Sequence, residues 1–454
     1  MANTRRNLNL TQGTIWKQVI LFALPLLGSS LIQQLYNTVD LIFVGQYLDK
    51  QASVAVGSGS LLITCIINFF TGLSVGVSVI TGQFFGAGNK EGLKKTVHSA
   101  AVICIVGGVV LALVGVTGAP VFLRWLNTPE EILPLGTVYI RIYFISIFSI
   151  VFFNVSSGIL RATGDSASPM RYQLMGGITN VIADWFFIVV LDMGVAGVAI
   201  ATLASQSVAA FLTVRKLTKF PEEYRLHFHQ IRCDLEILKK VFTIGVPSGI
   251  QGMILTLSNL VVQGNINTLD VSSIAAFVAY YKVELFIYTP IQAIGQTAMT
   301  FVSQNVGAKQ PARARQGIRW CIGMGVTLSI CTAILLLNIP TAAFSLFTKD
   351  SGVIEIGTAI IRNTFPFYFI YVFLEVFSCT LRGTGRSMPP MFITIANMCG
   401  VRILLVTLIM HYTPTAPSVA MIYPATWLTS ALCMFAYYKL SKCLNDKAIH
   451  EKGR

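Results

Sequence analysis

Twelve long apolar stretches follow one another along almost the whole chain, and no other feature constrains its fold as strongly. A helix needs about 20 consecutive apolar residues to cross a hydrocarbon core roughly 30 Å thick. Only 11% of the 454 residues are charged, whereas a soluble protein carries about 25% charged residues. The sequence therefore predicts an all-α integral membrane protein with twelve transmembrane helices. The expected spans are residues 15–45, 52–82, 93–117, 134–157, 169–191, 195–216, 241–266, 273–303, 314–338, 355–379, 388–411 and 417–440.

The net charge of +14 follows the expected membrane topology. In a soluble protein such a charge would suggest a nucleic-acid partner. Here 26 of the 33 Lys and Arg residues, Arg5 and Arg6 among them, lie at the N-terminus, after the even-numbered spans, at the C-terminus or in the adjoining ends of the spans. Cytoplasmic loops carry this excess of Lys and Arg. We therefore expect a multi-pass plasma-membrane protein with both termini in the cytoplasm and no nucleic-acid partner.

The chain contains an internal repeat. Residues 160–166 read Leu-Arg-Ala-Thr-Gly-Asp-Ser, residues 381–387 read Leu-Arg-Gly-Thr-Gly-Arg-Ser, and the two segments lie 221 positions apart. Pro25 in the first span likewise matches Pro247 in the seventh. Because each half holds six spans, both halves enter the membrane with the same polarity, as in transporters with parallel repeats. We expect two pseudo-symmetric six-helix bundles, 1–216 and 241–440, with a cytoplasmic linker, 217–240, and a cytoplasmic tail, 441–454.

Two features that could suggest a metal site have simpler interpretations. The linker carries His227 and His229, and a solvated linker explains them better than a metal site does. The nine cysteines occur singly, without a Cys-x-x-Cys pair, which is typical of small packing residues.

Four polar residues inside the first half form a candidate site, because ionisable residues within membrane spans are costly and indicate function. Asp40 lies in the first span and Asp184 in the fifth, with Asn180 one helical turn before Asp184 on the same face. Thr202 adds a hydroxyl in the sixth span. At about 1.5 Å per residue, all four lie roughly 8–16 Å from the outer ends of their spans. Their counterparts in the second half are Val261, Val401, Leu405 and Tyr423.

We interpret these four residues as a cation-coupling pocket, and the alternative is a polar cluster that only stabilises helix packing. Two neighbouring carboxylates resist being ionised together, so the pair can take up and release H⁺. Together with amide and hydroxyl oxygens it could instead bind Na⁺. The sequence leaves both ions open, and we expect no cofactor or metal besides the coupling ion. Pro25 allows a helix kink through which ion binding could alter the packing of the first span.

Polar and aromatic stripes within the spans are candidate substrate sites. Tyr281, Glu284 and Tyr288 share one face of the eighth span, which suits an amphipathic organic cation. Glu284 could instead be neutralised by Lys282 or Arg402. Glu375 in the tenth span is expected to pair with a neighbouring arginine. The other candidate substrate residues are Gln33, Tyr36, Asn37 and Asn154.

The chain resembles the multidrug and toxic compound extrusion (MATE) family over nearly its full length. The resemblance is carried by Pro25-Leu26-Leu27, by the segment from Asp40 to Gly45, by residues 82–87, by the repeated Leu-Arg-x-Thr-Gly-x-Ser signature and by residues 180–184. It implies a pair of six-helix bundles and antiport of drugs or metabolites against H⁺ or Na⁺. The sequence looks closest to the DinF-like branch, whose coupling site maps onto Asp40, Asn180, Asp184 and Thr202. We expect a monomer in the lipid bilayer that acts on small molecules.

Three other functions fit the sequence less well than antiport does. A lipid-linked oligosaccharide flippase of the same superfamily is the main alternative, but acidic groups in the first half argue against an anionic lipid substrate. An enzyme is not expected, because the spans hold no His-rich metal cluster, paired catalytic motif or phosphate loop. A channel fits two asymmetric halves less well than alternating access does.

Overall fold

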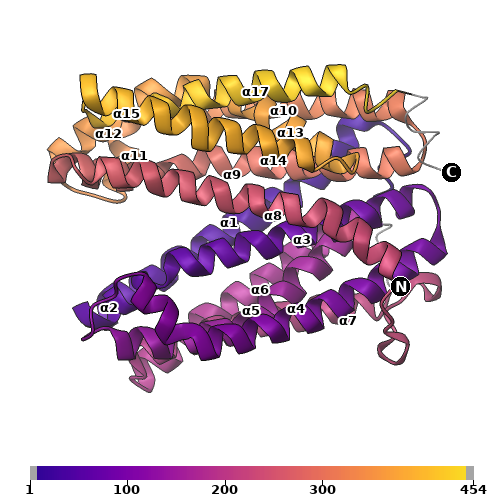
Figure 1. The fold of residues 1–454 in the computed structure, drawn as a ribbon, viewed down its shortest axis with the longest axis horizontal. Coiled ribbons are helices and arrows are strands. Elements are labelled where there is room, and N and C mark those ends of the chain that lie inside the picture. The colour runs from indigo at the N-terminus through magenta and orange to yellow at the C-terminus, as the bar shows by residue number, and fades with distance from the viewer. Residues whose placement is uncertain (1–7, 446–454) are drawn as a thin grey trace. The chain divides into compact units, whose positions relative to one another are not determined.

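The computed structural model describes residues 8–445, which fold into helices and the turns between them, with no strand among these residues (Figure 1). Within this part of the chain, twelve helical stretches are long and apolar enough to cross a membrane. The predicted fold class and the predicted number of spans are thus confirmed. The predictions about Arg5, Arg6 and residues 446–454 of the tail lie outside the described residues.

Most spans extend several residues beyond the predicted bounds, because the helices continue past the apolar windows into polar ends. The elements of the first half and the start of the second are α1 (Ile15–Tyr47), α2 (Lys50–Ser58), α3 (Ser60–Gly86), α4 (Lys90–Trp125), α5 (Leu133–Ala162), α6 (Ala167–Asp184), α7 (Gly194–Leu217) and α8 (Leu235–Ile266). The remaining elements are α9 (Val271–Gly307), α10 (Pro311–Asn338), α11 (Pro340–Ser345), α12 (Ser351–Thr364), α13 (Tyr368–Gly383), α14 (Met388–Ile395), α15 (Arg402–Tyr412), α16 (Ala416–Ala420) and α17 (Ile422–Leu440).

Several predicted spans are not single α-helices, which corrects the sequence interpretation. Gly59 separates α2 from α3. A short 3₁₀ turn, Phe365–Phe367, separates α12 from α13, since Pro366 has no backbone N–H to continue the helix. Two π-helical segments, Trp185–Val190 after α6 and Ala396–Val401 before α15, widen the fifth and eleventh spans. The apolar periodicity of a span does not reveal such local changes.

The repeated signature forms the same turn twice. Gly164 and Gly385 have φ angles of 89° and 83°, a left-handed conformation that glycine adopts without steric cost. In each copy the residue after this glycine donates its backbone N–H five residues back, from Asp165 to Leu160 (2.9 Å) and from Arg386 to Leu381 (3.0 Å). These bonds satisfy carbonyl groups at the ends of α5 and α13. The duplicated residues thus end equivalent helices in the same way.

By its contacts the chain divides into two units, and each unit includes a helix segment from the other half of the sequence. Unit 1 contains Leu24–Gly249, and unit 2 contains Leu10–Ala23 together with the residues from Ile250 onward. The first part of α1 therefore belongs with the second half, whereas the sequence assigns all of residues 1–216 to one bundle. Pro25 and Pro247 each lie within two residues of the position where their helix passes from one unit to the other.

Arg313 explains why the start of α1 belongs to unit 2. Its Nε donates to the backbone oxygen of Leu10 (3.1 Å), and its Nη2 donates to the backbone oxygen of Gln12 (2.9 Å) and to Oε1 of Gln18 (2.9 Å). The backbone N–H of Leu10 donates in turn to Oε1 of Gln304 (3.1 Å). These bonds attach the segment before α1 and its first turn to the C-terminal end of α9 and the N-terminal end of α10.

Much of the connection between α7 and α8 is exposed, His229 included, as the sequence suggested, while a few of its residues pack against unit 1. Phe220 and Leu226 are buried, and the backbone N–H of His227 donates to Nε2 of the buried His98 (3.3 Å). Asp234 ends the connection by accepting hydrogen bonds from the first backbone N–H groups of α8. No group of His, Cys, Asp and Glu side chains able to hold a metal occurs in the described part of the chain, and all nine cysteines are free.

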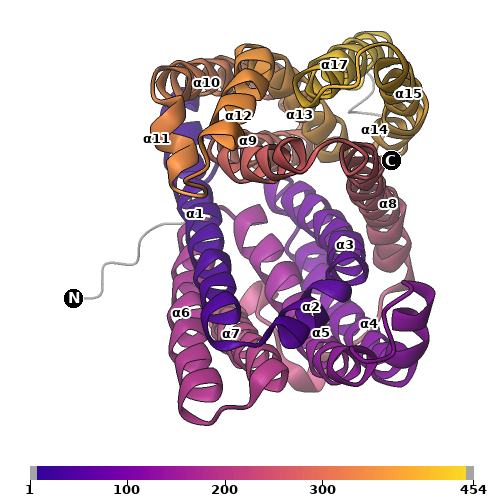
Figure 2. The same ribbon diagram turned by 90° about the vertical axis from the view of Figure 1, so that its left-hand side faces the viewer.

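Within unit 1, α5 lies between α4 and α7 (Figure 2), and the first part of α8 packs closely against α3. A Cβ atom on Gly72 would lie 2.1 Å from the backbone nitrogen of Gly249. Within unit 2, α9 packs against α10, α12 and α13. Small residues allow such close backbone approach between membrane helices.

Gly72→Ala is expected to lower the free energy of unfolding by about 1–3 kcal/mol, the usual cost of overpacking. The matched control is Gly264→Ala, because no atom lies within 4 Å of a Cβ built on Gly264. Thermal unfolding of both variants in detergent checks the prediction. Equal melting temperatures for the two variants would contradict the close contact between α3 and α8.

Candidate functional site

The first candidate site lies in unit 1, where α1 meets α6. The carboxyl groups of Asp40 and Asp184 lie within hydrogen-bonding distance of each other. Asp184 is 0% exposed, and Asp40 is half-buried. The structure therefore brings together the two carboxylates that the sequence singled out.

Buried oxygen atoms in this site lack hydrogen-bond donors. Apart from the contact between the two carboxyl groups, no donor among the described residues reaches Oδ1 of Asp40, Oδ1 of Asn180 or either carboxyl oxygen of Asp184. Leaving a buried acceptor without a donor is costly. A group of acceptors without donors is the chemistry that a proton or a hard cation such as Na⁺ satisfies.

Asp184 also occupies a special position in its helix. It is the last residue of α6, and the π-helical segment begins at the next residue. Such segments are rare and frequently occur at functional sites. Asn180 lies one turn earlier in α6 and is 2% exposed, as expected from its spacing to Asp184.

The contacts of the other predicted residues of unit 1 give less support for a role in the site. Thr202 is half-buried, and its hydroxyl donates to the backbone oxygen of Val198 (3.1 Å). Asn154 donates its side-chain N–H to Ile150 of its own helix (3.0 Å), so a helix-internal role accounts for it. Gln33 and Asn37 are exposed on α1.

Sequence reasoning missed the polar residues that surround Tyr36. The side chains of Gln33, of Gln173 in α6 and of Gln206 in α7 lie near the hydroxyl of Tyr36. Gln173 lies eleven residues before Asp184, and Gln206 lies four residues after Thr202, so each shares a helix face with a residue that the sequence singled out. This helical spacing is the feature of the sequence from which Gln173 and Gln206 could have been predicted. Tyr139 and Tyr143 of α5 interact electrostatically with Asp40, and they too are four residues apart on one helix face.

The second candidate site is a cavity of about 340 Å³ within unit 2. It is lined by Tyr281, Glu284 and Tyr288 of α9, which confirms that these three predicted residues share one face. The hydroxyl groups of Tyr281 and Tyr423 are 2.7 Å apart. Further lining residues are Leu255, Asn259, Lys282, Leu285, Tyr371, Met398, Arg402 and Trp427.

Neither of the two cations proposed for Glu284 forms an ion pair with it among the described residues. Tyr280 (3.4 Å) and Tyr368 donate their hydroxyl groups to Oε1 of Glu284. The ammonium group of Lys282 lies over the ring of Phe347, 5.6 Å from its centroid.

Arg402 is 3% exposed and is held by neutral side chains. It donates to Ser258 (3.3 Å) and Asn259 (2.8 Å) of α8 and to Thr426 (3.3 Å) of α17. Its guanidinium also lies 5.0 Å from the ring centroid of Tyr423. These contacts fix its position without neutralising its charge.

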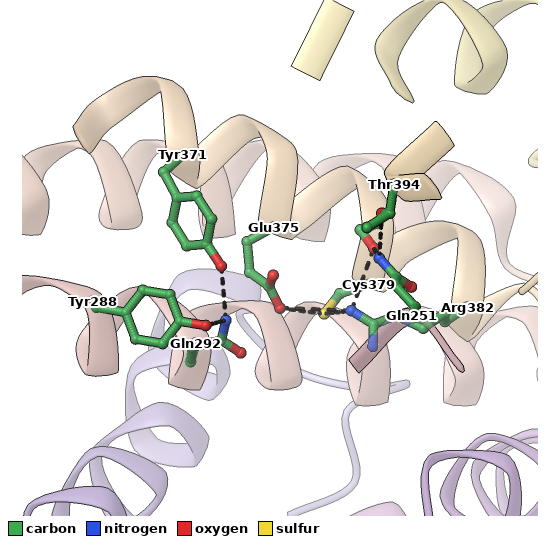
Figure 3. A network of polar contacts seen from close by, with 9 residues as sticks. Gln251, Tyr288, Gln292, Tyr371, Glu375, Cys379, Arg382 and Thr394 are labelled. Carbon is green, nitrogen blue, oxygen red and sulfur yellow. Dashed lines mark hydrogen bonds and ion pairs between the residues drawn. The ribbon is translucent and has the colours of Figure 1, made fainter. Parts of the chain in front are cut away.

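A chain of polar side chains continues from this cavity along α13 (Figure 3). Gln292 donates to the hydroxyl groups of Tyr288 (3.0 Å) and Tyr371 (2.9 Å). One turn further, Glu375 accepts a hydrogen bond from Cys379 (3.1 Å) and forms an ion pair with Arg382 (3.6 Å). The predicted pairing of Glu375 with an arginine is confirmed.

Twelve spans in two repeated halves, with a buried carboxyl pair in one unit and a charged cavity in the other, define a multi-pass membrane transporter. The family model MatE matches residues 25–186 and 247–408, most of both halves. The chain therefore belongs to the MatE family, whose members are transporters and not enzymes. Its assignment to the DinF-like branch stays a prediction.

Individual relatives agree with this assignment. The chain is 28% identical over 437 residues to the probable multidrug resistance protein YoeA of Bacillus subtilis, covering 94% of both chains. It is also 28% identical to a FAD transporter of Shewanella oneidensis, with 82% of both chains covered. A solved structure described as an outward-facing multidrug resistance MATE transporter superposes with a TM-score of 0.90 at 22% identity, over 99% of this chain and 100% of that one.

Glu375→Gln is expected to destabilise the protein by about 3 kcal/mol, because it leaves Arg382 charged in a largely buried position without its anion. Only 15% of the Arg382 side chain and 10% of the Glu375 side chain are exposed. The measurement is thermal unfolding in detergent. Adding Arg382→Gln to the same variant should recover part of the loss, and a double variant no more stable than the single one would rule out a charge effect.

Proposed function

We propose that this protein is a cation-coupled antiporter, driven by H⁺ or Na⁺, that exports small amphipathic and often cationic organic molecules by alternating access. The observation that carries the proposal is the contact between Asp40 and Asp184, surrounded by buried oxygen atoms without donors. The coupling set comprises these two residues, Asn180 and Thr202.

The chemistry of the pair suits ion coupling. With both carboxyl groups ionised, α1 and α6 repel each other in a low-dielectric site. A bound proton or Na⁺ removes this repulsion and lets the helices pack closely. The ion thus favours one packing of α1 over another, which is the differential interaction that coupling requires. Pro25 gives α1 a position without a backbone hydrogen bond at which it can bend.

Two regions suit the organic substrate. Beside the coupling pair, an apolar hollow of about 280 Å³ between α1 and α6 is lined by Tyr36, Val39, Gly177 and Val181 among others, and it suits the apolar part of an amphipathic molecule. Gln33 and Asn37, both exposed on α1, supply polar groups in the same unit. In unit 2, Tyr281, Glu284 and Tyr288 line the charged cavity. The names of the relatives, a multidrug resistance protein and a FAD transporter, support organic cargo.

The distribution of Lys and Arg supports a plasma-membrane protein with both termini in the cytoplasm. In this orientation Asp40 and Asp184 lie closer to the outer surface of the membrane. The coupling ion enters from that side, where its electrochemical potential is higher. A single chain contains both candidate sites, so a monomer suffices for transport.

The test of coupling uses purified protein in liposomes and a fluorescent organic cation such as ethidium, with an imposed H⁺ gradient in one arm and an Na⁺ gradient in the other. Asp40→Asn and Asp184→Asn should each slow gradient-driven transport by roughly tenfold or more, within the usual range of coupling energies.

The matched control is Asp192→Asn, which makes the same change at an exposed residue between α6 and α7. It should transport like the unmodified protein. Full transport by both pocket variants would contradict the site, and no response of the unmodified protein to either gradient would contradict antiport.

A further inference from the structure

The cavity of unit 2 contains two opposite charges that do not neutralise each other. Glu284 and Arg402 both line it and interact electrostatically, yet no ion pair joins them in the described part of the chain. Burying one charge inside a membrane protein is costly, and burying two without direct pairing forgoes the attraction that would offset the cost. Helix packing alone therefore does not explain why both charged residues lie in this cavity.

Each of the two charged groups is fixed in place and keeps one unused hydrogen-bonding position. Both tyrosine hydroxyl groups at Glu284 bond to Oε1, and no donor among the described residues reaches Oε2. Arg402 uses Nη1 and Nη2 for its contacts to α8 and α17, while its buried Nε finds no acceptor there. The carboxyl group of Glu284 and the guanidinium group of Arg402 thus belong to residues that line the same small cavity.

Aromatic rings form much of the remaining wall. The ring centroids of Tyr423 and Trp427 are 6.2 Å apart, and those of Tyr371 and Trp427 are 5.4 Å apart. Rings in this arrangement stack against a flat apolar group and attract a cation over their faces. The volume of about 340 Å³ is near the lower limit for ligand sites, so it suits one fused ring system with a short side chain.

We propose that this cavity binds a small aromatic zwitterion, whose ammonium group pairs with Glu284 and whose carboxylate pairs with Arg402. A ligand with both charges matches the carboxyl group and the guanidinium group at once. An organic cation would meet Glu284 but would be repelled by Arg402 and by Lys282 at the rim, and an aromatic anion would leave Glu284 unmatched. The proposal rests on the transport of organic molecules proposed above, but not on the coupling ion.

Three probes with the same indole ring test the proposal. Tryptophan carries an ammonium and a carboxylate group, tryptamine carries only the ammonium group, and indole-3-propionate carries only the carboxylate. Binding to the purified full-length protein in detergent is measured with radiolabelled tryptophan and by competition with the other two. Tryptophan should bind about tenfold tighter or more than either analogue, because each analogue loses one charge-assisted hydrogen bond.

Three variants, one at Glu284 and two at Arg402, assign the charges. Glu284→Gln should weaken binding of tryptophan and tryptamine while leaving that of indole-3-propionate unchanged. Arg402→Gln should weaken binding of tryptophan and indole-3-propionate while sparing tryptamine. Arg402 also connects α8 with α17, so its loss could disturb the fold. Arg402→Lys keeps the positive charge and should retain the preference for tryptophan over tryptamine. The comparison of the three probes on the unmodified protein requires no variant at all.

Each remaining outcome overturns the proposal. Equal or tighter binding of tryptamine would make the cavity a site for organic cations, and equal or tighter binding of indole-3-propionate would make it a site for anions. Binding of none of the three probes would exclude the proposed class. Because the assay uses no ion gradient, a failure of coupling in liposomes leaves its result unchanged, and the two proposals fail separately.

Discussion

The hydrocarbon core of a bilayer offers no water to a polar group, so every N–H, C=O and charge at that depth needs a partner within the protein. The helices of this chain meet the requirement for the backbone. Hydroxyl and amide groups meet it for the Nη atoms of Arg402, and Cys379 and Arg382 meet it for Glu375. The few places where it is not met are therefore informative. Among them in the described part of the chain are Oδ1 of Asp40 and the carboxyl oxygen atoms of Asp184 in unit 1, and Nε of Arg402 in unit 2.

These two exceptions occupy equivalent parts of the repeat but carry opposite chemistry. In unit 1 the fifth span supplies Asp184, and its counterpart at the repeat offset is Leu405. In unit 2 the eleventh span supplies Arg402, whose counterpart is Val181. Arg402 holds the seventh and twelfth spans with a permanent positive charge, whereas the acidic site lacks a cation of its own. The two repeated halves thus share one scaffold, with a carboxyl pair in one unit and a fixed guanidinium group in the other.

The sequence predicts the spans, the repeat and the carboxyl pair because each depends on local apolarity, on identity at a fixed offset or on the cost of a buried charge. It does not predict the break at Gly59 or the π-helical segments, since these depend on packing against neighbouring helices. Gln173 and Gln206 were missed because uncharged amides cost less in a membrane than carboxylates do. The hydrogen bonds that Arg313 makes to the start of α1 join residues some 300 positions apart, and no local pattern reveals them.

The exchange of helix segments between the units has a consequence for biosynthesis. Leu10–Ala23 is synthesised well before the rest of its unit, whose other residues begin at Ile250. Its hydrogen-bond partners Gln304 and Arg313 are made only after two thirds of the chain. The first transmembrane helix must therefore remain incompletely packed in the bilayer while most of the protein is synthesised. Neither half can complete its own unit alone, so a chain divided in the connection between α7 and α8 would regain its structure only when both fragments insert into the same membrane.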